Sequence, residues 1–278
     1  MNRNELSPDF LIDTTRKENV YLLGFLWADG WIHNKGYTHS VGMSLIKDDF
    51  ILIEPLLRQF GVKSFHERQR SQNGKSFGRV SKNCLIQSKS IVDFLLENDY
   101  DKKSGCAPTK ILSLIPNELR LYFWRGYLDG DGCISCRGTK REIAFWSTIE
   151  QDWSELIDVI SDLGIQYQIY TYLRKNGAHK SSVLRMGRLD DLVKFGDYIY
   201  GEYDGIGLRR KHERYLELKT QQKTIHRKTS SHVGVFLSRR TGRWGANIYN
   251  PVTKKQKHLG WFSSEMLAIE AIKSTTNS

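Results

Sequence analysis

The chain of 278 residues contains no long apolar segment, and this absence excludes one class of protein. A run of about 18 apolar residues marks a membrane-spanning helix, and no such run occurs. The sequence also shows neither the residue pattern of a nucleophilic triad nor a glycine-rich loop that cradles phosphate. We therefore expect neither a membrane span nor either of those two kinds of active site.

Cysteine is scarce as well. Only four cysteines occur and no signal peptide precedes them, which is typical of a reducing cytosol and not of a secreted, disulfide-stabilised domain. Cys133 and Cys136 have the spacing of half a zinc site, but Cys84 and Cys106 do not form a matching second pair. We expect a cytoplasmic protein, and structural zinc is not favoured.

Acidic residues are outnumbered, and the imbalance is uneven along the chain. The sequence has 42 Lys and Arg against 31 Asp and Glu, a formal net charge of +11. Residues 220–278 contain ten basic and two acidic residues, a balance of +8, so the first 219 residues carry only +3. Basic proteins attract nucleic acid through its phosphates, and such binding weakens as salt rises. The charge therefore predicts a nucleic-acid partner.

Two short segments, residues 22–30 and 124–132, repeat one pattern 102 residues apart. Each is mostly apolar, has a small residue at its third and seventh positions, and ends in Asp-Gly. An isolated Asp-Gly is usually only a turn, but residues four apart share a helix face, where small side chains let helices approach closely. We therefore predict two crossing helices that bring Asp29 and Asp131 together. Each helix is expected to stop at a glycine in the left-handed conformation.

Each motif opens a longer unit of roughly 100 residues, the usual size of a small domain. Strand and helix patterns follow both motifs in the same order, α-β-β-α-β-β-α. We therefore predict an α+β fold with two pseudo-symmetric αββαββα repeats, in residues 1–115 and 116–218.

The two motifs, their spacing and the flanking pattern resemble the LAGLIDADG homing endonucleases in their single-chain, two-repeat form, over about residues 15–215. The resemblance implies that two sheets form a saddle on double-stranded DNA and that a monomer cuts both strands to leave short 3′ overhangs. It implies that the last acid of each motif, Asp29 or Asp131, binds the catalytic Mg²⁺ ions. At the motif's sixth position Trp27 replaces the family's usual Asp, which the second copy keeps as Asp129; that position is not a metal ligand in the family.

Phosphodiester hydrolysis needs an activated water and stabilisation of the leaving oxygen, which two hard cations about 3.5–4 Å apart can supply. Carboxylates and water are ligands that suit Mg²⁺, and a nearby basic side chain would help. Family members often have one there, and Lys103 and Lys211 occupy equivalent points of the two repeats. The adjacent Lys102 and Arg210 are the alternatives, and a charge run is often only a solvated turn.

A separate small domain is predicted in residues 232–278, after a polar, basic linker in residues 219–231. Three short strand patterns precede one helix. Gly234-Val235, the run from Arg243 to Ala246, the run from His258 to Phe262 and the helix resemble the Apetala/ethylene-response-factor DNA-binding domain. The resemblance implies that basic and aromatic side chains of this sheet contact DNA, here Arg239, Arg240, Arg243, Trp244 and Lys257.

Tryptophan has two interpretations in this small domain. Trp244 either contacts DNA or packs in the core, as large aromatic side chains commonly do. We expect Trp261 and Phe262 to pack beneath the helix.

These observations predict a monomeric, Mg²⁺-dependent, site-specific DNA endonuclease of a mobile genetic element, intron-encoded or freestanding, acting on double-stranded DNA in a bacterial or phage-infected cytosol. Two alternatives stay open: a maturase that binds the RNA of its own intron, and a DNA-binding regulator that does not cut. Retention of both Asp29 and Asp131 favours the enzyme, because carboxylates without a metal repel phosphates.

Overall fold

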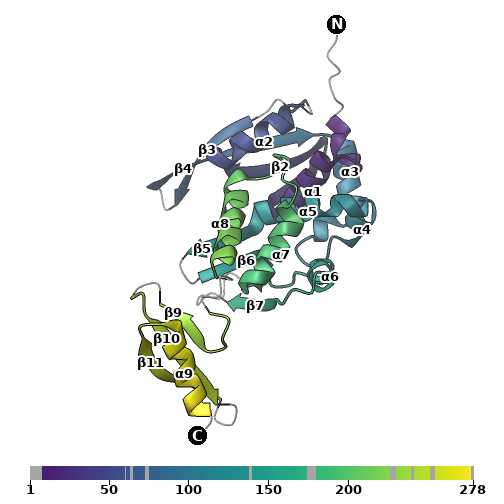
Figure 1. Ribbon diagram of the computed structural model, residues 1–278. Coiled ribbons are helices and arrows are strands. Elements are labelled where there is room, and N and C mark those ends of the chain that lie inside the picture. The colour runs from purple at the N-terminus through teal and green to yellow at the C-terminus, as the bar shows by residue number, and fades with distance from the viewer. Residues whose placement is uncertain are drawn as a thin grey trace. The chain divides into compact units, whose positions relative to one another are not determined.

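The computed structural model describes residues 8–59, 61–62, 65–72, 75–137, 140–173, 180–225, 230–238, 241–250 and 254–276 (Figure 1). The chain divides into two compact units, Met1–Lys219 and Thr220–Ser278, and each is described by itself. Across the described ranges, no helix has both the length and the apolar character that crossing a bilayer requires.

The first unit contains the same series of elements twice. The first series is α1 (Lys17–Asp29), β1 (Gly30–Lys35), β2 (Thr38–Ile46), α2 (Lys47–Gln59), β3 (Phe65–Gln72), β4 (Lys75–Gln87) and α3 (Lys89–Glu97). The second is α5 (Arg120–Asp131), β5 (Gly132–Arg137), β6 (Lys140–Thr148), α6 (Ser154–Asp162), β7 (Gln168–Leu173), β8 (Lys180–Met186) and α7 (Leu189–Tyr200). The predicted α+β fold with two αββαββα repeats is confirmed.

Shorter elements precede and follow the two series. They are η1 (Pro8–Ile12), η2 (Tyr100–Lys102), α4 (Thr109–Ser113) and η3 (Asn117–Leu119), and the longer helix α8 (Arg209–Ile225) closes the second repeat. Helix α8 extends beyond residue 219, so the segment expected to be a linker begins as helix.

Each repeat forms one antiparallel sheet with the same strand order, β1-β2-β4-β3 and β5-β6-β8-β7. Side chains alternate between the two faces of a strand. In the second sheet Ile143 and Phe145 of β6, with Leu184 and Met186 of β8, belong to the hydrophobic core beneath the helices. The residues between them point the other way, to what we call the open face of the sheet.

Helices α1 and α5 pack against each other more extensively than any other pair of described elements. A β-carbon built on Gly24 would lie 1.9 Å from the Phe123 carbonyl oxygen, and one on Gly126 would lie 2.0 Å from the Tyr21 carbonyl oxygen. No real side chain tolerates such distances, so the two backbones touch at the glycines. The small residues of the motif therefore serve the close helix crossing that the sequence predicts.

The glycines that end the two motif helices do not adopt the expected left-handed conformation. Gly30 has φ −89° and Gly132 has φ −92°, both extended. Space is the reason for glycine: a β-carbon would lie 2.5 Å from the Tyr100 hydroxyl at Gly30 and 2.4 Å from the Leu128 carbonyl oxygen at Gly132. The prediction of a left-handed stop is therefore wrong, and the chain passes directly from helix into strand.

The second unit contains β9 (Val235–Leu237), β10 (Trp244–Asn250), β11 (Lys255–Phe262) and α9 (Glu265–Thr276). The strands form an antiparallel sheet in the order β11-β10-β9. Val235, Ala246 and Ala268 are the buried centre of its small core. The predicted three-stranded sheet with one helix is confirmed.

Candidate functional site

Asp29 and Asp131 are the last residues of α1 and α5, and the helix crossing places these two ends side by side. A β-carbon on Gly130 would lie 2.7 Å from the Ala28 Cβ and 3.5 Å from the Asp29 Cβ. Both aspartates are exposed to solvent. The structure therefore brings the two predicted carboxylates to one solvent-facing place.

The two carboxylates interact electrostatically. Surrounding protein atoms raise the pKa of Asp131 to about 6, and the nearby charge of Asp29 acts in the same direction. Lys103 and Lys211 oppose this rise. Like charges that share a site disfavour double ionisation, so a cation placed between them would relieve the repulsion.

Lys103 and Lys211 bind the ends of the two motif helices. The Lys103 ammonium donates to the carbonyl oxygens of Leu26 (3.1 Å), Trp27 (2.9 Å), Ala28 (3.3 Å) and Gly30 (2.7 Å). The last turn of a helix has carbonyls without helical partners and carries partial negative charge. Lys103 therefore holds the end of α1 directly beneath Asp29.

The Lys211 ammonium does the same for α5. It donates to the carbonyl oxygens of Leu128, Asp129 (2.9 Å) and Gly132 (2.9 Å), and the side chain is buried. Burial lowers the pKa of each lysine to about 8. The equivalent positions predicted from the repeat are therefore equivalent in space, and both lysines cap helices, a role that the sequence did not reveal.

The two alternative basic residues are engaged elsewhere. Lys102 is exposed and pairs with Asp99 at 3.0 Å. Arg210 donates two hydrogen bonds, each 2.7 Å, to the carboxylate of Asp49 on α2. Arg210 thereby joins α8 to the first repeat and does not point to the end of either motif helix.

Asp129 forms a buried polar cluster. Its carboxylate accepts hydrogen bonds from the Tyr21 hydroxyl (2.9 Å), the Tyr200 hydroxyl (3.2 Å) and the Leu208 backbone N–H (2.7 Å). Burial raises the pKa of this carboxyl, and the hydrogen bonds and Lys211 counteract that rise. Because Leu208 immediately precedes α8, Asp129 fixes the start of the helix that carries Lys211.

The matched position in the first repeat is occupied by an aromatic side chain among aromatic rings. Trp27 packs against Tyr100 and Phe123, with ring centroids 5.9 and 6.3 Å apart. Phe123 occupies the place on α5 that Tyr21 occupies on α1. The loss of the first motif's Asp is thus accompanied by loss of the hydroxyl that would contact it, a pairing that comparison of the two motif helices could have found.

The donor set at the helix ends suits a hard cation. Within the ranges that the structure describes, no three His, Cys, Asp or Glu side chains converge as a complete metal cage. Two solvent-facing carboxylates are what a magnesium site needs when water and substrate phosphates supply the other ligands. The residues present therefore fit Mg²⁺ bound together with a phosphodiester.

The pair Cys133 and Cys136 does not fit a zinc site. Cys133 and Cys136 lie three residues apart on β5, and residues at that spacing point to opposite faces of a strand. All four cysteines belong to the described part of the chain, and none forms a disulfide.

The basic residues expected to contact DNA in the second unit divide into two groups. Arg239 and Arg240 lie outside the described residues. Arg243 is exposed and donates to the Trp261 carbonyl oxygen at 3.0 Å. Lys257 is exposed on β11 opposite Ile248.

One of the two tryptophans of the second unit lies where the sequence did not predict it. Trp244 and Phe262 pack against the core beneath α9. Trp261 does not, which corrects the expectation that it packs there. It is 43% exposed, with its ring against those of Phe236 and His258. Neighbouring strand residues face opposite ways, so Trp261 and Phe262 cannot both lie under the helix.

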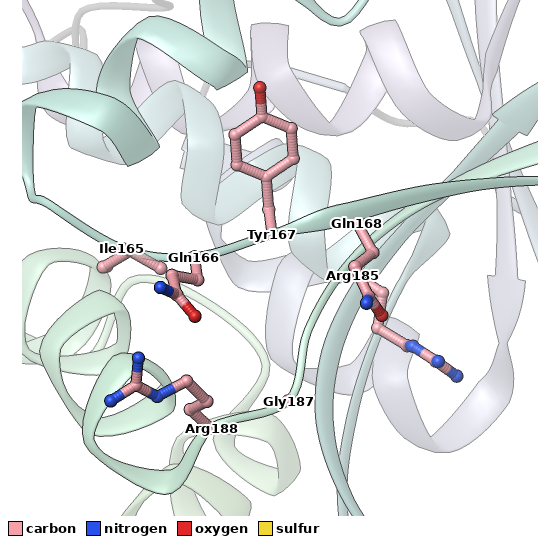
Figure 2. Close-up of a pocket in the computed structure, with 7 residues that line it drawn as sticks. All are labelled: Ile165, Gln166, Tyr167, Gln168, Arg185, Gly187 and Arg188. Carbon is pink, nitrogen blue, oxygen red and sulfur yellow. The ribbon is translucent and has the colours of Figure 1, made fainter.

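A cavity of about 490 Å³ opens at the edge of the second sheet (Figure 2). Residues from the start of β7 and the end of β8 line it: Ile165, Gln166, Tyr167, Gln168, Arg185, Gly187 and Arg188. Arg185 pairs with Glu142 at 3.5 Å and Arg188 with Asp191 at 3.8 Å. The carboxylates offset the two guanidinium charges, and the cavity extends the polar end of the sheet's open face.

Comparisons with known proteins identify a domain and the fold. Residues 118–200 match a family model described as a LAGLIDADG-like domain, whereas no curated protein matches the sequence. The solved structure of the homing endonuclease I-WcaI bound to its DNA recognition sequence is 14% identical, with a TM-score of 0.50, covering 73% of this chain and 87% of that one.

Two further structures have lower TM-scores. I-DmoI in complex with DNA and Ca is 18% identical, with a TM-score of 0.45 over 71% of this chain and 95% of its own. Full-length DUF199/WhiA from Thermatoga maritima is 17% identical, with a TM-score of 0.45 over 81% and 67%. Residues 118–200 are therefore similar to a LAGLIDADG-like domain, and the chain has the α+β fold of a LAGLIDADG homing endonuclease structure.

Proposed function

We propose that this protein is a site-specific endonuclease that cuts double-stranded DNA. The observation that carries the proposal is the close crossing of α1 and α5 at Gly24 and Gly126, which places Asp29 and Asp131 side by side in solvent. A protein that only bound DNA would gain nothing from two carboxylates at its centre, because they repel phosphate.

Asp29 and Asp131 are the residues that would hold the divalent cations. Such cations supply an activated water and stabilise the leaving 3′ oxygen. The chain's own contribution is placement: the helix crossing sets the spacing of the carboxylates, and their solvent exposure leaves room for a scissile phosphate. Hydrolysis on both strands leaving short 3′ overhangs, Mg²⁺ as the ion and action as a monomer are parts of this proposal.

Lys103 and Lys211 act in this proposal by position and charge. Each ammonium holds three or four carbonyls at a motif helix end. Burial lowers the pKa of Lys103, and the charges of Asp131 and Asp29 oppose that effect. A fixed positive charge beside the reacting phosphate stabilises the negative charge that develops there.

The open faces of the two sheets are the surfaces proposed to lie on DNA. The first strand of each sheet, β1 or β5, begins at the residue after Asp29 or Asp131, so each sheet starts at the site. The second unit is proposed as an accessory DNA-binding module in which Arg239, Arg240, Arg243 and Lys257 supply the basic contacts. Linking a second binding module raises its effective concentration at the target.

The test uses purified protein, Mg²⁺ and a library of long duplexes that includes the flanks of its own gene. Cutting at one site is expected. Asp29→Asn and Asp131→Asn should each abolish cutting while leaving binding intact, because they remove a cation ligand but no DNA contact. Asp158→Asn on α6, an exposed acid away from the site, is the matched control.

The same test distinguishes the alternatives. Binding without cutting under all metal conditions would support a DNA-binding regulator. Preferential binding of the RNA intron would support a maturase. Normal cutting by either Asn variant would show that the metal ligands are misassigned.

A further inference from the structure

The open face of the second sheet carries an apolar cluster of its own. Ala144 and Val183 are each 1% exposed, yet neither belongs to the main hydrophobic core that contains their strand neighbours Phe145 and Leu184. Since the neighbours point beneath the helices, Ala144 and Val183 point to the open face. They are covered there by other side chains of that face.

The covering side chains are aromatic. Strand pairing sets Trp146, Val183 and Tyr170 in one row across β6, β8 and β7. Tyr172, one row further along β7, contacts Trp146 with ring centroids 5.5 Å apart. Trp146 is 39% and Tyr172 43% exposed. A surface of rings therefore lies over Val183 and remains open to a ligand.

The equivalent row of the first sheet is polar. Ser44 lies 102 residues before Trp146, and strand pairing sets it in a row with Asn83 and His66 across β2, β4 and β3. All three side chains form hydrogen bonds readily, and none is aromatic except the imidazole of His66. The two pseudo-symmetric sheets thus present different chemistry at the same place.

The groups that DNA bases present in the major groove indicate what this difference between the two sheets would select. Base edges there show hydrogen-bonding groups and one prominent apolar group, the C5 methyl of thymine. Aromatic rings offer no partners to the polar edges and leave them desolvated, and the Tyr170 hydroxyl already donates to the Gln168 side chain. Contact with thymine methyls carries no such cost.

We propose that the half of the DNA target on the second sheet is selected through thymine methyl groups by Trp146, Tyr170 and Tyr172, whereas the other half is read there by hydrogen bonds to Ser44, Asn83 and His66. The inference rests on the proposed function and adds the base preference of one half-site. Arg185, whose guanidinium lies 4.6 Å from the centre of the Tyr170 ring, and its cross-strand partner Gln168 border the apolar row with polar groups.

The experiment begins with the full chain and a randomised duplex library in EDTA, so that bound sequences are recovered uncut. Thymines of the recovered site are then replaced by deoxyuridine in one half at a time, and dissociation constants are measured. Substitution in one half should weaken binding about fourfold for each buried methyl lost, the equivalent of one apolar carbon. Substitution in the other half should have little effect.

Variants assign the sensitive half to the second sheet. Trp146→Ala should abolish the uracil penalty, whereas the matched variant Asn83→Ala on the first sheet should keep it. Because the uracil comparison also works on unaltered protein, a variant that fails to fold does not remove the test. Equal penalties in both halves, no penalty, or tighter binding of an isolated strand than of the duplex would overturn the inference, the last because bare bases stack on aromatic rings.

The outcomes separate this inference from the proposed function. A bound duplex that stays uncut when Mg²⁺ is added would refute the endonuclease and leave the thymine test intact. Failure to enrich any duplex would refute both.

Discussion

At the scale of single residues, the site combines two exposed carboxylates with a partly buried lysine, Lys103, and a buried one, Lys211. Asp29 and Asp131 face solvent at helix ends, while Lys103 and Lys211 lie beneath them and bind the carbonyls of the last helical turn. The negative groups can therefore be reached by a cation from solvent, whereas the positive groups are held in place. This arrangement predicts different effects from the two kinds of substitution.

Lys211→Met should destabilise the fold. The substitution removes three hydrogen bonds from buried carbonyls, and each unsatisfied buried group costs about 1–3 kcal/mol. Partial relaxation and water entry reduce the sum, so we expect a loss of about 2–4 kcal/mol in the free energy of unfolding. Urea denaturation measures it, with Lys102→Met, at an exposed ion pair, as the matched control expected to lose less than about 1 kcal/mol. Equal losses in the two variants would contradict a helix-capping role.

The raised pKa of Asp131 predicts a pH dependence of stability in metal-free protein. Its folded pKa of about 6 lies above the ordinary value of 3.8, so the folded state binds a proton more tightly than the unfolded state. This stabilisation is present at low pH and is lost as pH rises through about 6. The melting temperature of the native protein relative to Asp131→Asn should therefore fall between pH 4 and pH 7 in EDTA. A difference that stays constant with pH would contradict the raised pKa that burial, with the nearby charge of Asp29, gives Asp131.

At the scale of elements, the crossing of α1 and α5 determines the geometry of the site. Gly24 and Gly126 let the backbones touch, and the strands that follow the two helices, β1 and β5, belong to two separate sheets. A change in the separation of the helices would alter the distance between the carboxylates.

Gly24→Ala should damage both stability and function. The added β-carbon would lie 1.9 Å from the Phe123 carbonyl oxygen, and backbone atoms there cannot move aside as a flexible side chain can. We expect a loss of more than about 3 kcal/mol in the free energy of unfolding, measured by urea denaturation. Gly187→Ala is the control, because nothing lies within 4 Å of the position that a β-carbon would take there. A mild effect at Gly24 would show that the helices can separate.

Features of these elements that depend on local sequence could be predicted, whereas features that depend on contacts between residues far apart in the sequence could not. The repeat order and the helix crossing followed from local periodicity and from small residues four apart. The need for glycine at position 30 could not be predicted in this form, because it arises from the hydroxyl of Tyr100, seventy residues away. The capping by Lys103 and Lys211 was hidden for the same reason, although their equivalence in the repeat was visible.

In the second unit, the sequence predicted the strands but not which face of the sheet each side chain occupies. A shift of one residue moves a side chain to the other face, and β10 and β11 contain an irregularity in register between Ala246 and Asn247. Aromatic content identified the strands but could not decide which tryptophan faces the core. Trp244 does, and Trp261 does not.

At the scale of the whole molecule, positive charge is divided unequally between the two units. The +8 of residues 220–278 concentrates net positive charge in the second unit, to which the proposed function assigns contacts with DNA phosphates. Lys257→Ala on the full chain should weaken binding to all duplexes alike and lower the slope of log affinity against log salt by about 1. Binding titrations at several salt concentrations measure both, with Lys89→Ala on α3 as the control. A changed base preference in Lys257→Ala would instead assign sequence readout to that residue.

The contacts around the sixth motif position, Trp27 in the first repeat and Asp129 in the second, also determine which repeats can pack together. The Asp129 carboxylate needs the Tyr21 hydroxyl from the other repeat, and Trp27 packs against Phe123 from the other repeat. Two copies of the second repeat would set Phe123 against the buried carboxyl of Asp129, and two copies of the first would set the Tyr21 hydroxyl against Trp27. Each half is therefore complementary to its opposite and not to itself, and we expect separately expressed halves of this unit to associate as a one-to-one heterodimer.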